Sequence, residues 1–476
     1  MLFHTLDYLV FLGLLVLLYW GLPRRFRAPL LGVASVAFYA SWSVVYLPVM
    51  LMVIGVAWLG GEWLATWRQW TGHRWRRAGV MGLLLLPLLF FKYFDWIAEN
   101  IEVVGVWLRL PVKLPRVAMP LPVGISFFTF QAIAYVIDVG RAAQRGEDGA
   151  EHNLGRFTTF QTFFPQLVAG PIVRGHELLP QLERPPDLRE HQIGAGVFRI
   201  CRGMAKKLLV ADVLRVGMVD PIFTDPGAFT GVERWIALYA YTLQIYADFS
   251  GYSDIAIGSA RLFGFELPEN FRRPYRAASV SEFWRRWHIT LSDWIRDYLY
   301  FPLGGSQGGE RKTYRNLMIT LVIIGVWHGA SWNFVLYGAL HGAVMVLERW
   351  RRKRSEERGE TGGPEGLAWA WRWALTLHFV VLARILFRTP DLAGARDFVA
   401  GLLELELLLP RFSPAVWATF ALGWAVHFMP ERWSPALEQT FRRSSPWVWV
   451  AAAAITGALA MLMSTGEQLA FVYYQF

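Results

Sequence analysis

The 476-residue chain has little cysteine and little charge. Its single cysteine, Cys201, excludes an internal disulfide bond and a cysteine-based metal cluster, and we interpret it as a small apolar filler. Only 18% of the residues are charged, whereas 54% are hydrophobic and 16% are aromatic. No low-complexity tract or polar linker separates a soluble domain. These absences argue against the soluble multidomain protein that length alone would suggest.

Apolar runs recur along nearly the whole chain, which predicts a polytopic membrane protein. The opening MLFHTLD lacks the basic region of a cleavable signal peptide. Because a span needs about 20 apolar residues, some segments are short, and the two longest could each hold two pieces. We expect roughly ten or eleven membrane segments. The hydrophobic segments are 6–21, 29–43, 46–66, 79–97, 120–139, 233–263, 317–347, 368–388, 413–429 and 447–463.

The net charge of +10 could indicate nucleic-acid binding. In a membrane protein, however, it more often reflects basic cytoplasmic loops, and we favour that explanation. Placing four basic clusters in the cytoplasm puts both termini outside, with an even number of crossings between 140 and 351. The clusters are Arg24, Arg25 and Arg27; Arg68, Arg74, Arg76 and Arg77; RRKRSEER from Arg351; and FRRSS from Phe441.

The middle of the chain departs from simple spans. Residues 140–232 and 268–316 mix apolar stretches with Arg, Pro and Gly, as in FFPQLVAGPIVR (163–174). Irregular backbone at membrane depth survives only inside protein or beside a wet cavity. We therefore expect re-entrant and interfacial pieces around a passage.

The stretch SVSEFWRRWHITLSDWIRDYLYF (279–301) predicts an amphipathic helix that begins at a capping box of Ser279 and Glu282. Its tryptophan-rich side is suited to a membrane interface. His288 lies at the edge of that side, where a structural histidine and a functional one are both open. The apolar side comprises Trp284, Trp287, His288, Leu291, Trp294, Ile295 and Tyr298, opposite Arg286, Asp293, Arg296 and Asp297.

Arginines before and within this stretch form a cationic surface: Arg272, Arg273, Arg276, Arg285 and Arg286. They could attract anionic lipid headgroups or hold the phosphates of a cytosolic cofactor.

A second polar set lies in an apolar segment, YADFSGYSDIAIGSARLFGF (246–265). Buried carboxylates in a span suggest function, but polar contacts between helices are an equal alternative. The set includes Asp248, Ser250, Tyr252, Ser253 and Asp254.

The apolar segment GVWHGASWNFVLYGALHG (325–342) carries His328, Asn333 and His341. On a continuous helix the two histidines would be rotated by about 220° from each other, so they could share a site only if the helix breaks. A histidine in a dry tunnel stays neutral and can act as a general base on a hydroxyl. We expect this of His328, which has Asn333 little more than a turn away, and a packing or hydrogen-bonding role for His341.

Together these blocks resemble the membrane-bound O-acyltransferase superfamily, and most of all its bacterial alginate O-acetyltransferase branch. The resemblance covers roughly 1–476 and is strongest over 120–345. It is carried by PVGISFFTFQAIAYVIDV (122–139), FFPQLVAGPIVR (163–174), DFSGYSDIAIG (248–258), NFRRPYRAASVSEFWRRWHITLSDWIRDYLYFPLGG (270–305), WHGASWNFVLYGALHG (327–342) and the terminal FVYYQF.

The resemblance implies an all-α fold, a ring of helices around a thin centre with a tunnel. We expect one membrane domain, 1–476, with N-terminal helices in 1–119, a catalytic core in 120–347 and C-terminal helices in 348–476. The location implied is the bacterial inner membrane, with both termini periplasmic. Metal is not expected.

The implied activity is transfer of an acetyl group from acetyl-coenzyme A to an exported polysaccharide, directly or through a periplasmic partner. His328 and His288 match the family's two catalytic positions, with His288 orienting the thioester or stabilising the oxyanion. Asp248, Tyr252 and Asn333 are expected to support them. The expected cofactor contacts are Arg273, Arg285, Arg286, Trp284 and Trp287.

Two other functions stay open. A D-alanyltransferase of the teichoic acid type would take its acyl group from a carrier protein. A glycan permease would use the same polar centre without consuming a thioester, although no inverted repeat of the transporter type is visible. The acceptor polymer and the oligomeric state are not readable from the sequence.

Overall fold

The computed structural model describes residues 1–66, 73–117, 119–184, 187, 190–359, 365–404, 406, 411–463 and 471, and these residues form helices and loops without a strand. The predicted all-α fold is thereby confirmed. Arg68 of the predicted basic clusters and most of the terminal FVYYQF lie outside the described residues.

The described chain groups into two compact units. Unit 1 comprises Met1–Ile200, Ile255–Pro268 and Arg442–Ala452, and unit 2 comprises Cys201–Asp254, Glu269–Phe441 and Ala453–Phe476. Four helices contribute residues to both units: α10 (Glu190–Ala205), α13 (Gly231–Leu262), α22 (Trp433–Arg443) and α23 (Pro446–Met463). The expected division of one membrane domain at 119 and 347 stays a prediction.

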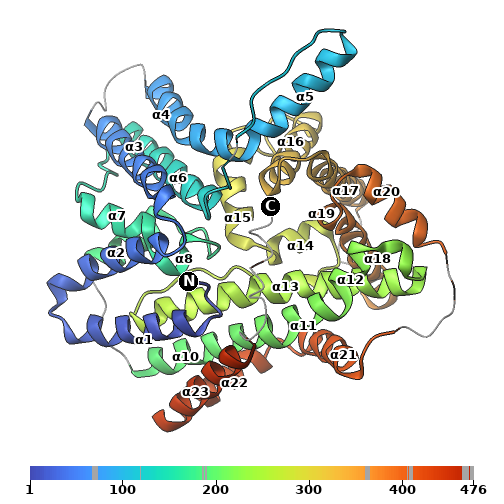
Figure 1. The fold of residues 1–476 in the computed structure, drawn as a ribbon. Helices are drawn as coiled ribbons and strands as arrows, with labels where there is room; N and C mark the ends of the chain where they lie inside the picture. Colours follow the sequence, from blue (N-terminus) through green and yellow to red (C-terminus); the bar gives the residue numbers. More distant parts are fainter. Residues whose placement is uncertain are drawn as a thin grey trace. The chain divides into compact units, whose positions relative to one another are not determined.

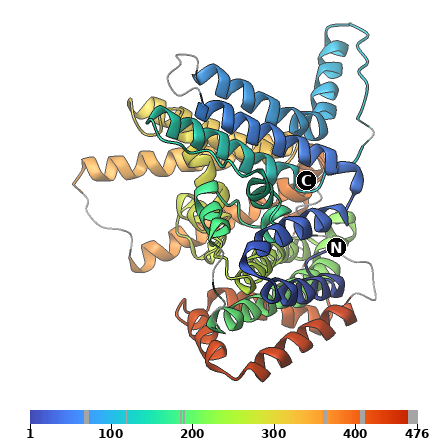
Figure 2. The same ribbon diagram turned by 90° about the vertical axis from the view of Figure 1, so that its left-hand side faces the viewer.

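Unit 1 is built mainly from apolar helices of the N-terminal half. Its helices α3, α4 and α6 pack against one another and lie side by side (Figures 1 and 2). The elements are α1 (Leu6–Gly21), α2 (Arg24–Ala40), α3 (Leu47–Thr66), α4 (His73–Leu88), α5 (Phe94–Trp107), α6 (Ile125–Gln144), α7 (Leu154–Thr162), α8 (Phe164–Leu167), α9 (Gly175–Glu183) and most of α10 (Glu190–Ala205).

Among the described residues, four helical stretches are long and apolar enough to cross a membrane. They are Val44–Thr66, Trp75–Trp107, Gly366–Arg388 and Pro446–Met463, and α1 is a shorter apolar helix. Each overlaps a segment expected from the sequence, which confirms the multi-pass character. The other expected segments are helical too, but they are shorter, broken or more polar.

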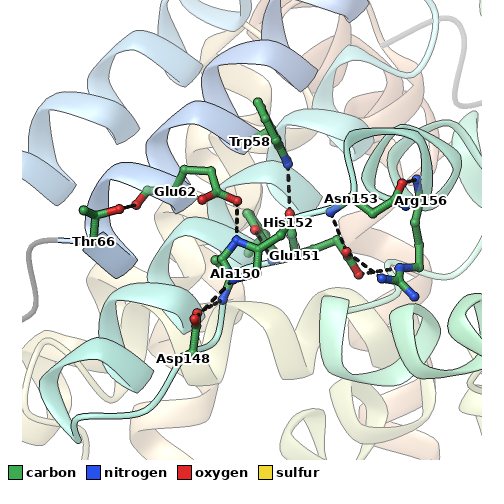
Figure 3. A network of polar contacts seen from close by, with 10 residues as sticks. Trp58, Glu62, Thr66, Asp148, Ala150, Glu151, His152, Asn153 and Arg156 are labelled. Carbon is green, nitrogen blue, oxygen red and sulfur yellow. Dashed lines mark hydrogen bonds and ion pairs between the residues drawn. The ribbon is translucent and has the colours of Figure 1, made fainter.

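A polar clasp in unit 1 fixes the loop after α6 to α3 (Figure 3). The His152 ring contacts Glu62 through Nδ1 at 2.7 Å and Asp148 through Nε2 at 3.1 Å. The Trp58 indole donates to the carbonyl of Glu151 at 2.8 Å, and the Glu151 carboxylate pairs with Arg156 at 2.7 Å. Two residues one turn apart on α3, Trp58 and Glu62, therefore hold consecutive loop residues.

We expect this clasp to weaken as pH rises. Hydrogen bonds to Glu62 and Asp148 raise the pKa of His152 above its ordinary value. A raised folded-state pKa stabilises the protein fully below the unfolded value of about 6.5 and loses that contribution as pH climbs through the folded value. Because the ring is 61% exposed, the contribution should stay below about 1 kcal/mol.

Hydrogen exchange of the 145–153 amides, corrected for intrinsic rates, should show stronger protection at pH 5.5 than at pH 8. The variant His152→Gln should remove this difference. Equal protection at both pH values in the unmodified protein would show that the clasp does not depend on protonation.

Unit 2 holds the shorter helices and the later apolar ones. Its elements are α11 (Asp212–Leu214), α12 (Asp220–Thr224), most of α13, α14 (Val280–Arg286), α15 (Ile289–Ile295), α16 (Glu310–His328), α17 (Trp332–Glu357), α18 (Gly366–Ala383), α19 (Ile385–Arg388), α20 (Leu392–Gly401), α21 (Pro414–Phe428) and most of α22 (Trp433–Arg443).

The expected single helix over 279–301 is wrong in its continuity. Its start is confirmed, since the Ser279 hydroxyl accepts from the Glu282 amide at 3.0 Å, while the Glu282 carboxylate bonds the Ala278 amide. The helix then stops at Arg286 and resumes as α15, because Trp287 is extended and His288 adopts a left-handed backbone conformation.

The expected placement of its tryptophan-rich side at a membrane interface is also wrong. Trp284, Trp287 and Trp294 are buried within the protein at 5%, 1% and 7% exposure. They pack on neighbouring rings such as Phe283 and Tyr298. The polar side chains on the opposite side are more exposed. The stretch therefore packs its apolar side inside the protein and exposes its polar side.

The apolar segment 317–347 forms an antiparallel pair, α16 and α17, with a break at residues 329–331. The Ser331 hydroxyl caps α17 by accepting from the Asn333 amide. The two helices approach so closely that a β-carbon at Gly325 would clash with the Phe334 carbonyl, and one at Gly338 would clash with the Leu321 carbonyl. Small residues at such contacts let membrane helices pack backbone to backbone.

Candidate functional site

The His328 imidazole lies in an aromatic cage in unit 2. It is the last residue of α16 and is 2% exposed. Its ring centroid lies 4.8 Å from that of Phe387 and 5.0 Å from that of Trp327, with two further rings at 6.2–6.3 Å. Those further rings belong to Tyr337 and Phe334. The surroundings are as dry as a neutral general base requires.

Asn333 fastens the cage from the first turn of α17. Its amide nitrogen donates to the Thr389 carbonyl at 2.9 Å and to the Thr389 hydroxyl at 3.2 Å, just beyond α19. This holds Phe387 between the rings of Phe334 and His328. Asn333 and His328 therefore lie in the same cage on either side of a helix break. A supporting role of Asn333 stays a prediction, and the contacts that link it to His328 run through Phe387.

His341 approaches the same cage because the helix breaks. Its ring lies 4.4 Å from Tyr337, which also contacts His328. The His341 ring is fully buried, and its Nδ1 accepts from the Trp284 indole at 3.3 Å. Because α16 and α17 are separate helices, His341 and His328 do not lie on opposite faces of one helix. The contacts of His341 are nevertheless those of the packing role expected for it.

His288 occupies a strained turn between α14 and α15. Its φ of 44° and ψ of 56° lie in the left-handed region, which costs a residue with a β-carbon about 1–2 kcal/mol. Two backbone bonds clamp the turn, from the Ile289 amide to the Asn270 carbonyl and from the Arg272 amide to the Arg286 carbonyl, each at 2.9 Å. Strain held in place this way is typical of functional positions.

Asn270 determines which nitrogen of His288 carries the proton. The Asn270 amide oxygen accepts from the backbone amide of Thr290 at 3.4 Å and the Thr290 hydroxyl at 3.0 Å, while the amide nitrogen donates to Ser253. The oxygen also faces His288 Nδ1 at 3.0 Å, so that nitrogen must be the donor. Assigned from this network, the neutral ring carries its lone pair on Nε2.

The charge of His288 follows from its burial. The ring is 0% exposed, and burial lowers its pKa to about 3, so it is neutral at physiological pH. A neutral ring that donates from Nδ1 can only accept at Nε2. The expected role of His288 as an oxyanion donor is therefore not compatible with this tautomer, whereas the role of orienting a donor group is.

We expect Asn270→Ala to lower activity by about one to two orders of magnitude. The change leaves a buried Nδ1–H without its acceptor, which costs about 1–3 kcal/mol and frees the ring to change tautomer. Initial rates of acetyl transfer in membranes would measure this. Thr290→Val is the matched control, because it removes a hydroxyl from the same oxygen but keeps His288 bonded. Equal rates for both variants would contradict the assignment.

One indole joins the two predicted catalytic histidines. Trp327 contacts the His328 ring at 5.0 Å and the His288 ring at 5.9 Å between centroids. On its other side His288 packs against Phe249 at 4.7 Å, and Phe249 in turn packs against Phe471 near the chain end. Tyr252, one turn further along α13, also contacts Phe471 at 4.9 Å. The structure thus brings His288, His328 and Tyr252 into one aromatic cluster.

Asp248 and Asp254 are held by basic residues that the sequence analysis missed. Lys207, 5% exposed at its side chain, contacts Asp212 at 2.8 Å and Asp248 at 3.0 Å. Asp254 pairs with Arg202 at 2.7 Å and with Lys206 at 2.8 Å. These pairs join α10 and the π-helical segment that follows it, Lys206–Ala211, to α13. Of the two open readings of this segment, the geometry favours polar contacts between helices.

The arginine-rich stretch lies partly on the surface. Arg285 is exposed, and Arg286 pairs with Glu282 at 2.9 Å and Glu431 at 3.2 Å. Arg273 is half-buried, with a left-handed φ of 46°. Of the two aromatic residues expected to contact the cofactor, Trp284 donates to His341 and Trp287 lies under the Arg384 guanidinium at 4.4 Å. Contact between any of these residues and a cofactor stays a prediction.

Arg384 is a further site residue that the sequence analysis missed. It is 1% exposed between α18 and α19, among residues that surround both histidines. An arginine within the apolar segment 368–388 was the signal that could have revealed it. Among the described residues, no group of three or more acidic, histidine or cysteine side chains could hold a metal ion.

Comparison with known proteins agrees with this geometry. The model of the MBOAT, membrane-bound O-acyltransferase family, matches residues 124–387, which include both histidines, Asn270 and Arg384. The chain is 39% identical over 395 residues to "Probable alginate O-acetylase AlgI" of Pseudomonas aeruginosa, covering 81% of this chain and 71% of that protein.

Two other relatives carry different acceptors in their names. "Peptidoglycan O-acetyltransferase" of Helicobacter pylori is 33% identical over 421 residues, which cover 83% of this chain and 77% of the relative. "Teichoic acid D-alanyltransferase" of Streptococcus thermophilus is 28% identical over 286 residues, which cover 56% of this chain and 67% of the relative.

Proposed function

The chain belongs to the membrane-bound O-acyltransferase family, and on this premise we propose that it is an O-acetyltransferase serving an exported polysaccharide. Acetyl-coenzyme A on the cytosolic side is the donor, and the acceptor hydroxyl is reached directly or through a periplasmic partner. The similarity to acetyl-transferring relatives over four fifths of the chain supports acetyl over D-alanyl transfer, because the D-alanyltransferases match a shorter part at lower identity.

The single observation that carries the mechanism is the dry aromatic cage around His328. A neutral imidazole there takes the proton of the attacking hydroxyl as its oxygen bonds to the thioester carbon. General-base assistance of this kind contributes roughly 10²–10⁴ in rate.

His288 supports this step as a fixed acceptor. With its Nδ1–H donating a hydrogen bond to the Asn270 amide oxygen, the Nε2 lone pair orients a donor, such as a hydroxyl or amide of the entering substrate. Trp327 fixes the positions of the two imidazoles relative to each other, since its indole contacts both rings.

The partly exposed arginines supply the charge for the donor. Arg273, Arg285 and Arg286 present guanidinium groups that pair with the phosphates of coenzyme A in bidentate fashion. We assign these arginines to the cytosolic side of the inner membrane and both chain termini to the periplasmic side. That orientation places the basic loops in the cytosol.

A donor assay tests the proposal. Inside-out membrane vesicles from the source cells receive radiolabelled acetyl-coenzyme A or, in parallel, D-alanyl carrier protein. Label from acetyl-coenzyme A should enter the polysaccharide fraction and be released by mild base. Label from the carrier protein alone would overturn the acetyl assignment. Glycan passage through reconstituted liposomes without thioester cleavage would support the permease instead.

A further inference from the structure

Arg384 is a buried cation at the turn from α18 to α19. The residue belongs to an apolar stretch long enough to cross a membrane, and its side chain is 1% exposed. Burying an arginine at membrane depth costs several kcal/mol, and such residues by default mark a functional site. Its immediate surroundings indicate which function this is.

The guanidinium of Arg384 stands between the neighbours of both histidines. Its central carbon lies 4.4 Å from the Trp287 ring and 5.3 Å from the Phe387 ring. Phe387 is the residue whose ring packs on His328, and Trp287 directly precedes His288. The guanidinium therefore contacts one aromatic residue associated with each of the two histidines.

A tyrosine lies close to this charge. The Tyr275 hydroxyl donates a hydrogen bond to the Thr242 carbonyl at 2.6 Å, and the Tyr275 side chain interacts electrostatically with the Arg384 guanidinium. The faces of Trp287 and Phe387 stabilise the cation through cation–π contacts. Since a guanidinium has five N–H donors in a rigid fork, it can serve more than one acceptor at once.

The proposed reaction needs a donor that His288 does not provide. When the hydroxyl oxygen bonds to the thioester carbon and its proton passes to His328, the carbonyl electron pair moves to the oxygen and forms an oxyanion. Collapse restores the carbonyl, breaks the carbon–sulfur bond and releases the coenzyme A thiolate, which takes up the proton. The oxyanion requires hydrogen-bond donors, and His288 presents a lone pair.

We propose that the Arg384 guanidinium donates to this oxyanion and is a catalytic residue of the acyl transfer. The inference rests on the proposed function and goes beyond it by assigning the charge that stabilises the transition state. Loss of one such donor typically lowers kcat by roughly 10²–10³. Ground-state binding of the thioester needs no comparable contribution, so KM should change little.

The test compares Arg384→Gln, Arg384→Lys and Arg384→Ala in inside-out vesicles supplied with radiolabelled acetyl-coenzyme A. Arg384→Gln should lose about 10²-fold or more in kcat, while KM for acetyl-coenzyme A stays within about threefold of the wild-type value. Arg384→Lys keeps the charge and should retain more activity. Methylguanidinium should partly restore Arg384→Ala, whereas sodium chloride at equal ionic strength should not.

Arg388→Gln is the matched control, four residues further along at the end of α19. Arg388 pairs with Asp220 at 2.7 Å and is 26% exposed at its side chain, so its kcat should stay close to that of the wild type. Thermal melting in detergent separates a folding defect from lost chemistry. A folded Arg384→Gln protein with wild-type kcat, or an Arg384→Ala protein that methylguanidinium does not rescue, would overturn the inference. Wild-type vesicles that take no label from acetyl-coenzyme A would instead refute the proposed function.

Discussion

His328→Ala is expected to abolish measurable polysaccharide acetylation while leaving the protein folded. Removing the imidazole takes away the group that accepts the hydroxyl proton, and that assistance is worth roughly 10²–10⁴ in rate. Three of the four aromatic rings of the cage pack on one another as well as on His328, so the fold should survive. Acetate released by mild base from the polymer of variant cells measures the effect.

The neighbouring imidazole provides the control for this prediction. His341→Ala removes a ring of the same size from the same aromatic cluster, but one that accepts a hydrogen bond from Trp284. It should lower the melting temperature without removing acetylation. If polymer from His328→Ala cells keeps its acetate at the wild-type level, His328 is not the base, whatever the outcome with His341→Ala.

Lys207→Met is expected to destabilise the protein by roughly 3–5 kcal/mol, because it leaves the carboxylates of Asp212 and Asp248 buried without their cation. The free energy of unfolding in detergent would measure this. The triple variant Lys207→Met, Asp212→Asn, Asp248→Asn removes all three charges together and should regain most of the stability, since neutral substitutes avoid the cost of unpaired charge.

Lys206→Met is the matched control for the second prediction. Its partner Asp254 keeps the Arg202 guanidinium at 2.7 Å, and Lys206 is 24% exposed at its side chain, so the loss should be small. Acetylation by the stabilised triple variant then separates the two open roles of Asp248. Wild-type acetylation would assign it to helix packing alone, and lost acetylation would assign it to the site. An unchanged stability of Lys207→Met would contradict the ion-pair account.

The apolar elements could be predicted from sequence because burial in lipid and in protein both select long hydrophobic runs. The expected segment 6–21 coincides with α1, and 46–66, 413–429 and 447–463 differ from α3, α21 and α23 by a residue at one or both ends. Membrane helices satisfy their backbone locally, so local composition suffices to find them.

The breaks within helices were the part that sequence periodicity missed. At 328–332 a signal existed, since Gly329 and the capping residue Ser331 punctuate the apolar run. At His288 there was no such signal, because no glycine stands at the turn. The left-handed conformation is held instead by backbone hydrogen bonds with Asn270 and Arg272, which are distant in sequence. A periodic pattern that continues across such a turn predicts one helix where there are two.

Partnerships over long sequence distances were hidden for the same reason. The pairing of Lys207 with Asp248, and the clustering of Arg384 with Trp287, join segments separated by about 40 and 97 positions in the chain. The sequence identified the carboxylates in 246–265, whose burial costs free energy, but not the basic residues that pair with them. The candidate histidines were identified by resemblance, and their chemistry, above all the tautomer of His288, became visible only with Asn270 in place.

Because α16 ends at His328, the imidazole lies at the carbonyl end of a 19-residue helix. The aligned peptide dipoles give that end about half of a negative elementary charge. In the proposed mechanism the ring becomes an imidazolium for the lifetime of the intermediate, and the backbone itself would then supply a counter-charge within the last turn. Extending α16 by a turn, for instance by replacing residues 329–331 with alanine, would carry that charge past the ring and leave the transient cation facing aromatic faces alone.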